Sequence, residues 1–345
     1  MPDAELPEDF LTFRCPLEAK EHPAMREVVA GSLAFAERFD LGAGDAERTA
    51  KYGSTAAVLQ CHFFPIGLAE AAVQPLADFS AWAYAAEDAM QPGIGALDVT
   101  RMACRYYGIL NNPDWCAPAG DNLEEALRDC LMRLRPTVTD YAYRWFTQWE
   151  ASWIKGLLWE STLLAGGEVL GVADFLPVRI AAVGVYGTYA YHGCFERAQP
   201  WLWSAPLARA ASECGILVAG LDNDRYSYFK ESQLKPGTSY SLFECFRVDD
   251  PTLTVRDSLA AGVSLRDALL GRYLQLRERI LASGTEQEKL LVAAVDLTIA
   301  GNVRMGLTTL RYAAPQLSQA RIVDEAPPAP DAPPPYPAVA WYWNV

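Results

Sequence analysis

Three oxygen-bearing side chains stand at four-residue intervals in the middle of the chain. Asn223, Ser227 and Glu231 occupy positions i, i+4 and i+8, and on an α-helix each step turns only about 40°, so the three share one narrow stripe. An amide, a hydroxyl and a carboxylate form the oxygen-only ligand set that Mg²⁺ prefers. The apolar residues 214–221 before them predict a buried helix, whose polar groups need partners. The spacing indicates a Mg²⁺ site; the alternative is an ordinary helix with a hydrogen-bonded polar face.

The nine residues from Asn223 to Glu231 read Asn-Asp-x-x-Ser-x-x-Lys-Glu. This pattern resembles the second metal-binding motif of class I terpene synthases, in particular the microbial branch of the family. Members ionise a prenyl diphosphate and cyclise the resulting carbocation. The resemblance implies Mg²⁺ as the cofactor, three ions in all, a prenyl diphosphate as the substrate, and contact between Lys230 and the diphosphate.

A second acidic patch lies upstream, five residues after Trp82, where the resemblance places one. The family pattern is Asp-Asp-x-x-Asp or Glu, whereas this chain has Glu87, Asp88 and, at the last position, Gln91. Compared with the first Asp of the family pattern, Glu87 keeps the negative charge on a longer side chain. Compared with the last acid, Gln91 keeps an oxygen atom but not the charge. The resemblance implies that all three are metal ligands. A solvated acidic pair near a helix end is the alternative.

Cationic groups for the diphosphate are implied at two further places. Arg179 lies 44 residues before Asn223, near the distance at which the family carries a diphosphate-sensing arginine; the alternative is a surface arginine. Arg311 and Tyr312, in a segment that begins Gly-Asn, resemble the closing Arg-Tyr motif of the family. A guanidinium suits two-pronged contact with phosphate oxygens, so Arg179, Lys230, Arg311 and Tyr312 are the expected catalytic residues.

The rest of the pocket must be apolar and aromatic, because a carbocation alkylates water and is stabilised by π faces. The expected lining residues are Phe63, Phe64, Ser80, Ala83, Tyr84 and Met305, with Trp153 and Trp159 as further candidates. Met305 stands where many members carry Trp, and Ala83 where a larger side chain is common. Both replacements predict room for a long isoprenoid.

Helical elements must position these residues, and no stretch of the chain sustains the period-two alternation of a strand. We predict an all-α fold of about ten helices, a class I terpene synthase-like bundle that encloses an apolar pocket. Residues 1–323 form a single catalytic domain, and residues 324–345 form a Pro-rich, flexible tail whose aromatic end could dock on the body. The expected helical stretches are Cys15–Leu41, Ala46–Gly67 with a break at Pro65, Glu70–Met90, Leu97–Leu110, Asn122–Leu134, Thr137–Leu164, Val172–Glu196 with an interruption near Val183-Gly184, Pro200–Tyr228, Ser239–Arg247, Leu265–Ala282 and Glu286–Thr309.

Composition excludes several other functions. The 29 basic and 43 acidic residues leave a net charge of −14, which disfavours nucleic acid and anionic membranes as partners. The longest uncharged runs fall short of a membrane span, the N-terminus lacks the features of a signal peptide, and the eight cysteines include no Cys-x-x-Cys pair. These features predict a cytoplasmic protein, and a homodimer is left open.

Two other functions compete with a terpene cyclase. A chain-elongating prenyltransferase of the same fold normally has two Asp-rich motifs, and the Asn223–Glu231 pattern argues against it. A non-catalytic protein that binds isoprenoids or prenyl diphosphates is made plausible by the altered Glu87–Gln91 patch. The presence of Arg179, Lys230 and Arg311 together favours an enzyme, with farnesyl and geranylgeranyl diphosphate ranked ahead of geranyl diphosphate as substrates.

Overall fold

The computed structural model describes residues 6–64, 70–90, 94–115, 120–185, 187, 189, 205–232, 241–328 and 330–345. In these ranges nearly all regular structure is helical, which confirms the all-α prediction. The described α-helices are α1 (Met25–Arg38), α2 (Ala46–Phe63), α3 (Glu70–Ala89), α4 (Ala96–Asn111), α5 (Asn122–Leu134), α6 (Asp140–Gly166), α7 (Val172–Ala182), α9 (Pro206–Glu231), α10 (Leu242–Asp249), α11 (Val255–Ser283), α12 (Glu286–Thr308) and α13 (Pro337–Ala340).

Two predicted helix starts were wrong, each for a local reason. The first helix begins at Met25 rather than at Cys15, because Pro16 and Pro23 keep the intervening backbone out of helical geometry. Helix α11 begins ten residues before the predicted Leu265, at Val255, where Thr254 and Asp257 form a reciprocal capping box.

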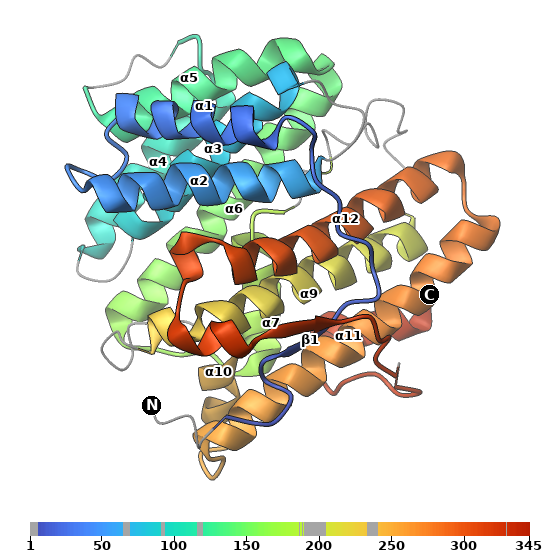
Figure 1. Cartoon of the computed structure of the whole chain (residues 1–345). Coiled ribbons are helices and arrows are strands. Elements are labelled where there is room, and N and C mark those ends of the chain that lie inside the picture. The colour runs from blue at the N-terminus through green and yellow to red at the C-terminus, as the bar shows by residue number, and fades with distance from the viewer. Residues whose placement is uncertain are drawn as a thin grey trace.

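Helix α9 lies at the centre of the bundle and packs against α7, α11 and α12. Figure 1 shows α12 between α9 and α2, with α1 and α3 beyond α2. By length and composition α12 could cross a membrane, but 67% of its most apolar stretch is buried inside the protein. Its apolar character therefore serves helix packing.

Buried charges attach the N-terminal segment to α9. Asp222 and Arg266 form a fully buried ion pair at 2.7 Å between α9 and α11. Arg225, one turn further along α9, donates to the backbone carbonyls of Asp9, Phe10 and Thr12. Burial lowers the pKa of Arg225 to about 10. Because an unpaired buried charge is costly, these partners determine where the segment lies.

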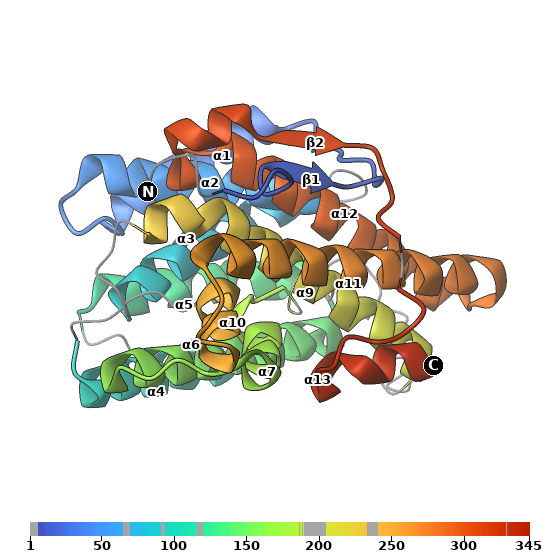
Figure 2. The same cartoon turned by 90° about the horizontal axis from the view of Figure 1, so that it is seen from below.

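Two short strands interrupt the all-helical pattern. β1 (Thr12–Arg14) pairs in parallel with β2 (Arg321–Val323), and Figure 2 shows the two side by side. The sequence analysis predicted no strand, because three residues are too few to display an alternation. The ladder joins the first described segment to the segment after α12.

The aromatic end of the Pro-rich tail is packed on the body, a docking that the sequence analysis left open for residues 324–345. Tyr342, in the 3₁₀ helix η6 (Trp341–Asn344), is fully buried. Its hydroxyl donates to Glu213 on α9 at 3.1 Å, and its carbonyl accepts two bonds from Arg272 on α11. The aromatic residues provide the packing that the prolines lack.

Candidate active site

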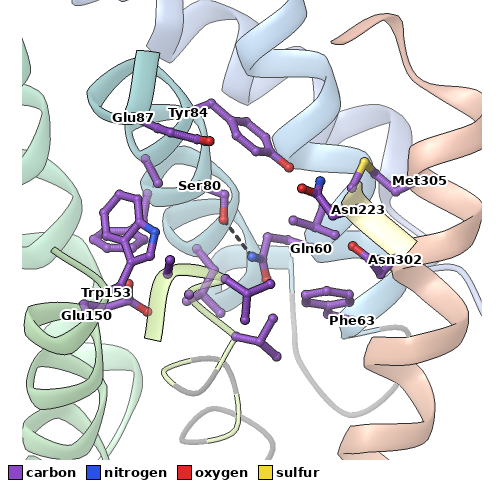
Figure 3. A pocket seen from close by; sticks show the side chains of 18 of the residues that line it. Gln60, Phe63, Ser80, Tyr84, Glu87, Glu150, Trp153, Asn223, Asn302 and Met305 are labelled. Carbon is purple, nitrogen blue, oxygen red and sulfur yellow. Dashed lines mark hydrogen bonds between the residues drawn. The ribbon is translucent and has the colours of Figure 1, made fainter. Parts of the chain in front are cut away.

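A cavity opens among α2, α3, α6, α7, α9 and α12 (Figure 3). Its volume is about 130 Å³. Phe63, Ser80, Ala83, Tyr84 and Met305 line it, as the sequence analysis expected, and so does Trp153.

Phe64 does not line this cavity, contrary to expectation. It follows directly on the last residue of α2 and is buried in the hydrophobic core. Neighbouring positions on a helix point about 100° apart, so Phe63 and Phe64 do not face the same space. Trp159 is 48% exposed and also lies outside the cavity lining.

The predicted stripe of oxygen atoms lies on α9, which extends to Glu231. Asn223 faces the cavity, Ser227 is buried, and the Ser227 hydroxyl has no partner at hydrogen-bonding geometry among the described residues. Burial raises the pKa of Glu231 to about 7, although Ser227, Lys230 and Arg179 act in the opposite direction. The last turn of this helix thus holds the Ser227 hydroxyl beside a carboxyl group that burial makes harder to ionise.

Arg179, on α7, contacts the N-terminal end of the same stripe. Its Nη2 atom lies 2.6 Å from Asp224 Oδ1 and donates to Asn223 Oδ1 and to the Gly220 carbonyl at 2.9 Å each. Burial would lower the pKa of Arg179, but Asp224, Glu160 and the other nearby carboxylates outweigh it and raise that pKa. The predicted diphosphate-sensing arginine therefore adjoins the predicted metal-binding helix as a buried, permanently charged group.

The acidic patch on α3 faces Arg311, in the 3₁₀ turn η4 (Leu310–Tyr312). Arg311 donates to both carboxylate oxygens of Asp88 at 3.0 Å and to Glu87 at 3.3 Å. The hydroxyl of Tyr52 donates to Asp88 at 2.6 Å, and Lys230 Nζ lies 4.0 Å from the same carboxylate. Burial would raise the pKa of Asp88, but these groups together hold it below its usual value. Gln91 lies outside the described residues.

Tyr312 joins the closing turn to α9. Its hydroxyl accepts a hydrogen bond from Asn223 Nδ2 at 3.2 Å, and its ring packs edge-on against Tyr226 at 4.5 Å. Tyr226 in turn donates to Asn302, whose amide donates to the Ala219 carbonyl. Burial raises the pKa of Tyr312, so the phenol keeps its proton at neutral pH.

Several residues of this site had no part in the sequence prediction. Tyr226 lies three positions after Asn223, and Asn302 three before Met305, so helical periodicity could have placed both near the pocket. Tyr52, Glu150 and Glu160 carried no such signal. Burial and nearby carboxylates raise the pKa of Glu160 to about 8, against the effect of Arg179.

The donors at this end of the cavity fit a Mg²⁺ ion. The Ser227 hydroxyl lies beside the Glu231 carboxyl group, and Glu87 is partly exposed at the cavity wall. Burial and neighbouring carboxylates raise the pKa values of Glu160 and Glu231. In the described ranges no three His, Cys, Asp or Glu side chains form a preformed cation site. Mg²⁺ commonly takes few protein ligands and completes its shell with phosphate and water.

Comparison with known proteins gives one consistent family. A family model described as "Terpene synthase family 2, C-terminal metal binding" matches residues 78–261. The diterpene cyclase DtcycB of a Streptomyces species is 29% identical over 320 residues, which cover 90% of this chain and 91% of the relative. Spiroviolene synthase of Streptomyces violens is 26% identical over 354 residues, which cover 96% and 95%.

A solved structure agrees at the level of the fold. The crystal structure of the SVS_A2 protein from ancestral sequence reconstruction has a TM-score of 0.83 at 24% identity, covering 96% of this chain and 98% of that chain. The matched family region spans more than half of the chain, from the acidic patch on α3 past the last turn of α9. The chain therefore belongs to terpene synthase family 2 and is a class I terpene synthase, a metal-binding lyase that acts on prenyl diphosphates.

Proposed function

We propose that this enzyme ionises farnesyl or geranylgeranyl diphosphate and cyclises the carbocation to a sesquiterpene or diterpene, with release of diphosphate. The observation that carries the proposal is the meeting of the α3 carboxylates, Asn223 on α9, Arg179 and Arg311 at one end of a cavity that is lined elsewhere mainly by aromatic and aliphatic side chains. The charged groups that would neutralise the diphosphate leaving group thus lie beside a cavity that would hold the hydrocarbon chain.

The charged end would hold the diphosphate. Glu87, Asp88 and Gln91 on one side, with Asn223, Ser227 and Glu231 on the other, would bind Mg²⁺, which when bound neutralises the charge that develops on the leaving group. The guanidinium groups of Arg179 and Arg311 are nearly buried and already oriented by carboxylates. Donors that are fixed before reaction need no reorganisation as the carbon–oxygen bond breaks.

Lys230 and Tyr312 would complete the diphosphate contacts. Lys230 is 38% exposed and lies near Asp88, so its flexible stem can reach an anion between α3 and α9. The Tyr312 phenol is protonated and can donate to a phosphate oxygen, since its hydroxyl accepts from Asn223 and donates to none of the described residues.

The apolar end would hold the carbocation away from water. Phe79, Phe146 and Trp153 line it, and Trp82 connects them in a cluster of edge-on and tilted rings. Ring faces stabilise positive charge without offering a nucleophile. Gln60 donates to the Ser80 hydroxyl at 2.7 Å, while its own amide oxygen is buried without a partner among the described residues.

The length of the substrate is inferred from the cavity and from one relative. The cavity of about 130 Å³ is smaller than the roughly 300–1,000 Å³ of typical ligand pockets, so side chains must move before a prenyl chain fits. Ala83 is small and Met305 is flexible, and both lie on the cavity wall. A relative named as a diterpene cyclase favours a twenty-carbon chain. We therefore keep farnesyl and geranylgeranyl diphosphate together and rank geranyl diphosphate third.

Diphosphate release tests the proposal. The purified protein is incubated with each of the three diphosphates, in Mg²⁺ or in EDTA, and free diphosphate is measured over time. We expect release from farnesyl or geranylgeranyl diphosphate that depends on Mg²⁺. Tight binding of a prenyl diphosphate without release would instead indicate an isoprenoid-binding protein.

A further inference from the structure

One carboxyl group lies in the cavity and has no place in the ionisation chemistry. Glu150, on α6, lines the cavity and is only 4% exposed. It makes no hydrogen bond or ion pair with the described residues, and the described part of the chain brings no charged group close enough to affect its pKa. Figure 3 shows it beside Trp153, on the same helix. A buried acid without a partner is costly, so its presence on a hydrocarbon-binding wall calls for a role.

The backbone leaves space for this group. A side chain at Gly187 would collide with the Glu150 carboxyl oxygen and with the Phe146 ring. Glycine at this position therefore keeps the carboxyl group free inside the cavity.

Glu150 lies at the end of the cavity far from the diphosphate site. Glu160, on the same helix, responds to the charges of Arg179, Glu87, Asp224 and Glu231, whereas Glu150 responds to none of them. Ten residues of α-helix, about 15 Å, separate the two glutamates. Glu150 is thus placed to meet the hydrocarbon part of a bound prenyl chain.

Burial alone raises the pKa of Glu150 well above its ordinary value, which favours the neutral carboxylic acid over the carboxylate. This state suits a carbocation cavity, because a carboxylate anion would trap the cation as an ester and a neutral carboxylic acid is a much weaker nucleophile. A neutral acid can also give its proton to a carbon–carbon double bond.

We propose that Glu150 transfers a proton to and from the cyclising hydrocarbon; the proposal rests on the proposed cyclase function. The first cyclic cation loses a proton to the released diphosphate and becomes a neutral polyene. The Glu150 O–H proton then adds to one alkene carbon of the polyene, which creates a new cation and the Glu150 carboxylate. The carboxylate removes a proton from a carbon next to the new cationic centre, and the electrons of that C–H bond form the final double bond.

Isotope incorporation tests this proposal. Between turnovers the Glu150 proton exchanges with solvent, so in D₂O the wild-type product should be one mass unit heavier than in H₂O. Glu150→Gln should remove the deuterium completely and release the neutral polyene instead, while diphosphate release stays within about threefold of wild type. Glu150→Asp, which keeps an acid, should retain part of the deuterium.

Glu244→Gln is the matched control, since Glu244 is a partly buried carboxyl group on α10 outside the cavity lining. This variant should incorporate deuterium as wild type does. A wild-type product without deuterium, or a Glu150→Gln product that keeps it, would overturn the proposal. The absence of any product or diphosphate release from wild type would instead count against the cyclase function itself, and the wild-type measurement decides even if a variant fails to fold.

Discussion

Arg311 and Asp88 form a two-pronged ion pair across 223 residues of sequence, with both Nη–Oδ distances at 3.0 Å. The guanidinium also lies over the ring of Tyr84, 4.5 Å from its centre. Because the side chain of Arg311 is 5% exposed, the pair is shielded from solvent and salt. It fixes the closing turn η4 against α3. The predicted Arg-Tyr motif and the predicted acidic patch therefore lie side by side.

The degenerate acidic patch gives the first prediction. Glu87→Ala should reduce Mg²⁺-dependent diphosphate release to background, whereas Gln91→Ala should be milder, because a neutral amide binds Mg²⁺ more weakly than a carboxylate does. Steady-state assays across a Mg²⁺ titration measure both. Greater damage from Gln91→Ala than from Glu87→Ala would show that the motif has been misaligned.

The end of α9 gives the second prediction. Glu231→Gln removes the one carboxylate of the stripe, and we expect the rate of diphosphate release to fall on the order of 100-fold or more, as with the loss of other transition-state electrostatic contacts. The amide keeps the shape of the side chain, so circular dichroism should show an unchanged helical fold. Wild-type turnover by the folded variant would end the metal-binding interpretation of α9.

The unpaired acid in the cavity gives a prediction for stability. The folded-state pKa of Glu150 lies above its unfolded value of 4.5, so the unfolded state releases its proton first as the pH rises. Wild type should therefore lose stability relative to Glu150→Gln by about 1.4 kcal/mol per pH unit above that value. Below pH 4.5 the difference should be independent of pH.

Urea unfolding of both proteins at several pH values between 4 and 7 measures this difference. Replacement of an exposed acid, Glu125→Gln on α5, serves as the control for the substitution itself. A constant gap between wild type and Glu150→Gln over the whole range would mean that the pKa of Glu150 is the same in the folded and the unfolded protein.

Hydrophobic periodicity predicted most of the fold, because an amphipathic or buried helix shows a regular pattern within its own stretch of sequence. Asn122–Leu134 was predicted with both ends correct, because Asp121 caps its first turn and a proline follows closely. The two-strand ladder could not be predicted in this way. It depends on a pairing between Thr12–Arg14 and Arg321–Val323, more than 300 residues apart, which local spacing does not reveal.

The site was harder to predict than the fold because cavity and core residues look alike. Met305 and Phe64 are each 1% exposed, yet only Met305 lines the cavity. Motif spacing predicted metal ligands along one helix, such as Asn223 and Glu231. Tyr52 reaches Asp88 only because α2 packs on α3, and no spacing in the sequence predicts that contact.

The docked tail gives a further prediction. Tyr342→Ala should lower the free energy of unfolding by about 3–5 kcal/mol, the range for removing a large buried aromatic side chain. Trp343→Ala, at a half-buried position in the same turn, should cost less. Chemical denaturation of the two variants provides the comparison. No effect of Tyr342→Ala would contradict the docking of this tail on the body.

Product analysis tests the central claim most directly. The protein is incubated with equal concentrations of geranyl, farnesyl and geranylgeranyl diphosphate in Mg²⁺, and the organic extract is analysed by gas chromatography and mass spectrometry. We predict a cyclic hydrocarbon or alcohol with fifteen or twenty carbons, formed only when Mg²⁺ is present. Cyclisation of geranyl diphosphate alone would refute the enlarged pocket inferred from Ala83 and Met305. Only linear alcohols, or no product from any of the three, would contradict the assignment as a cyclase.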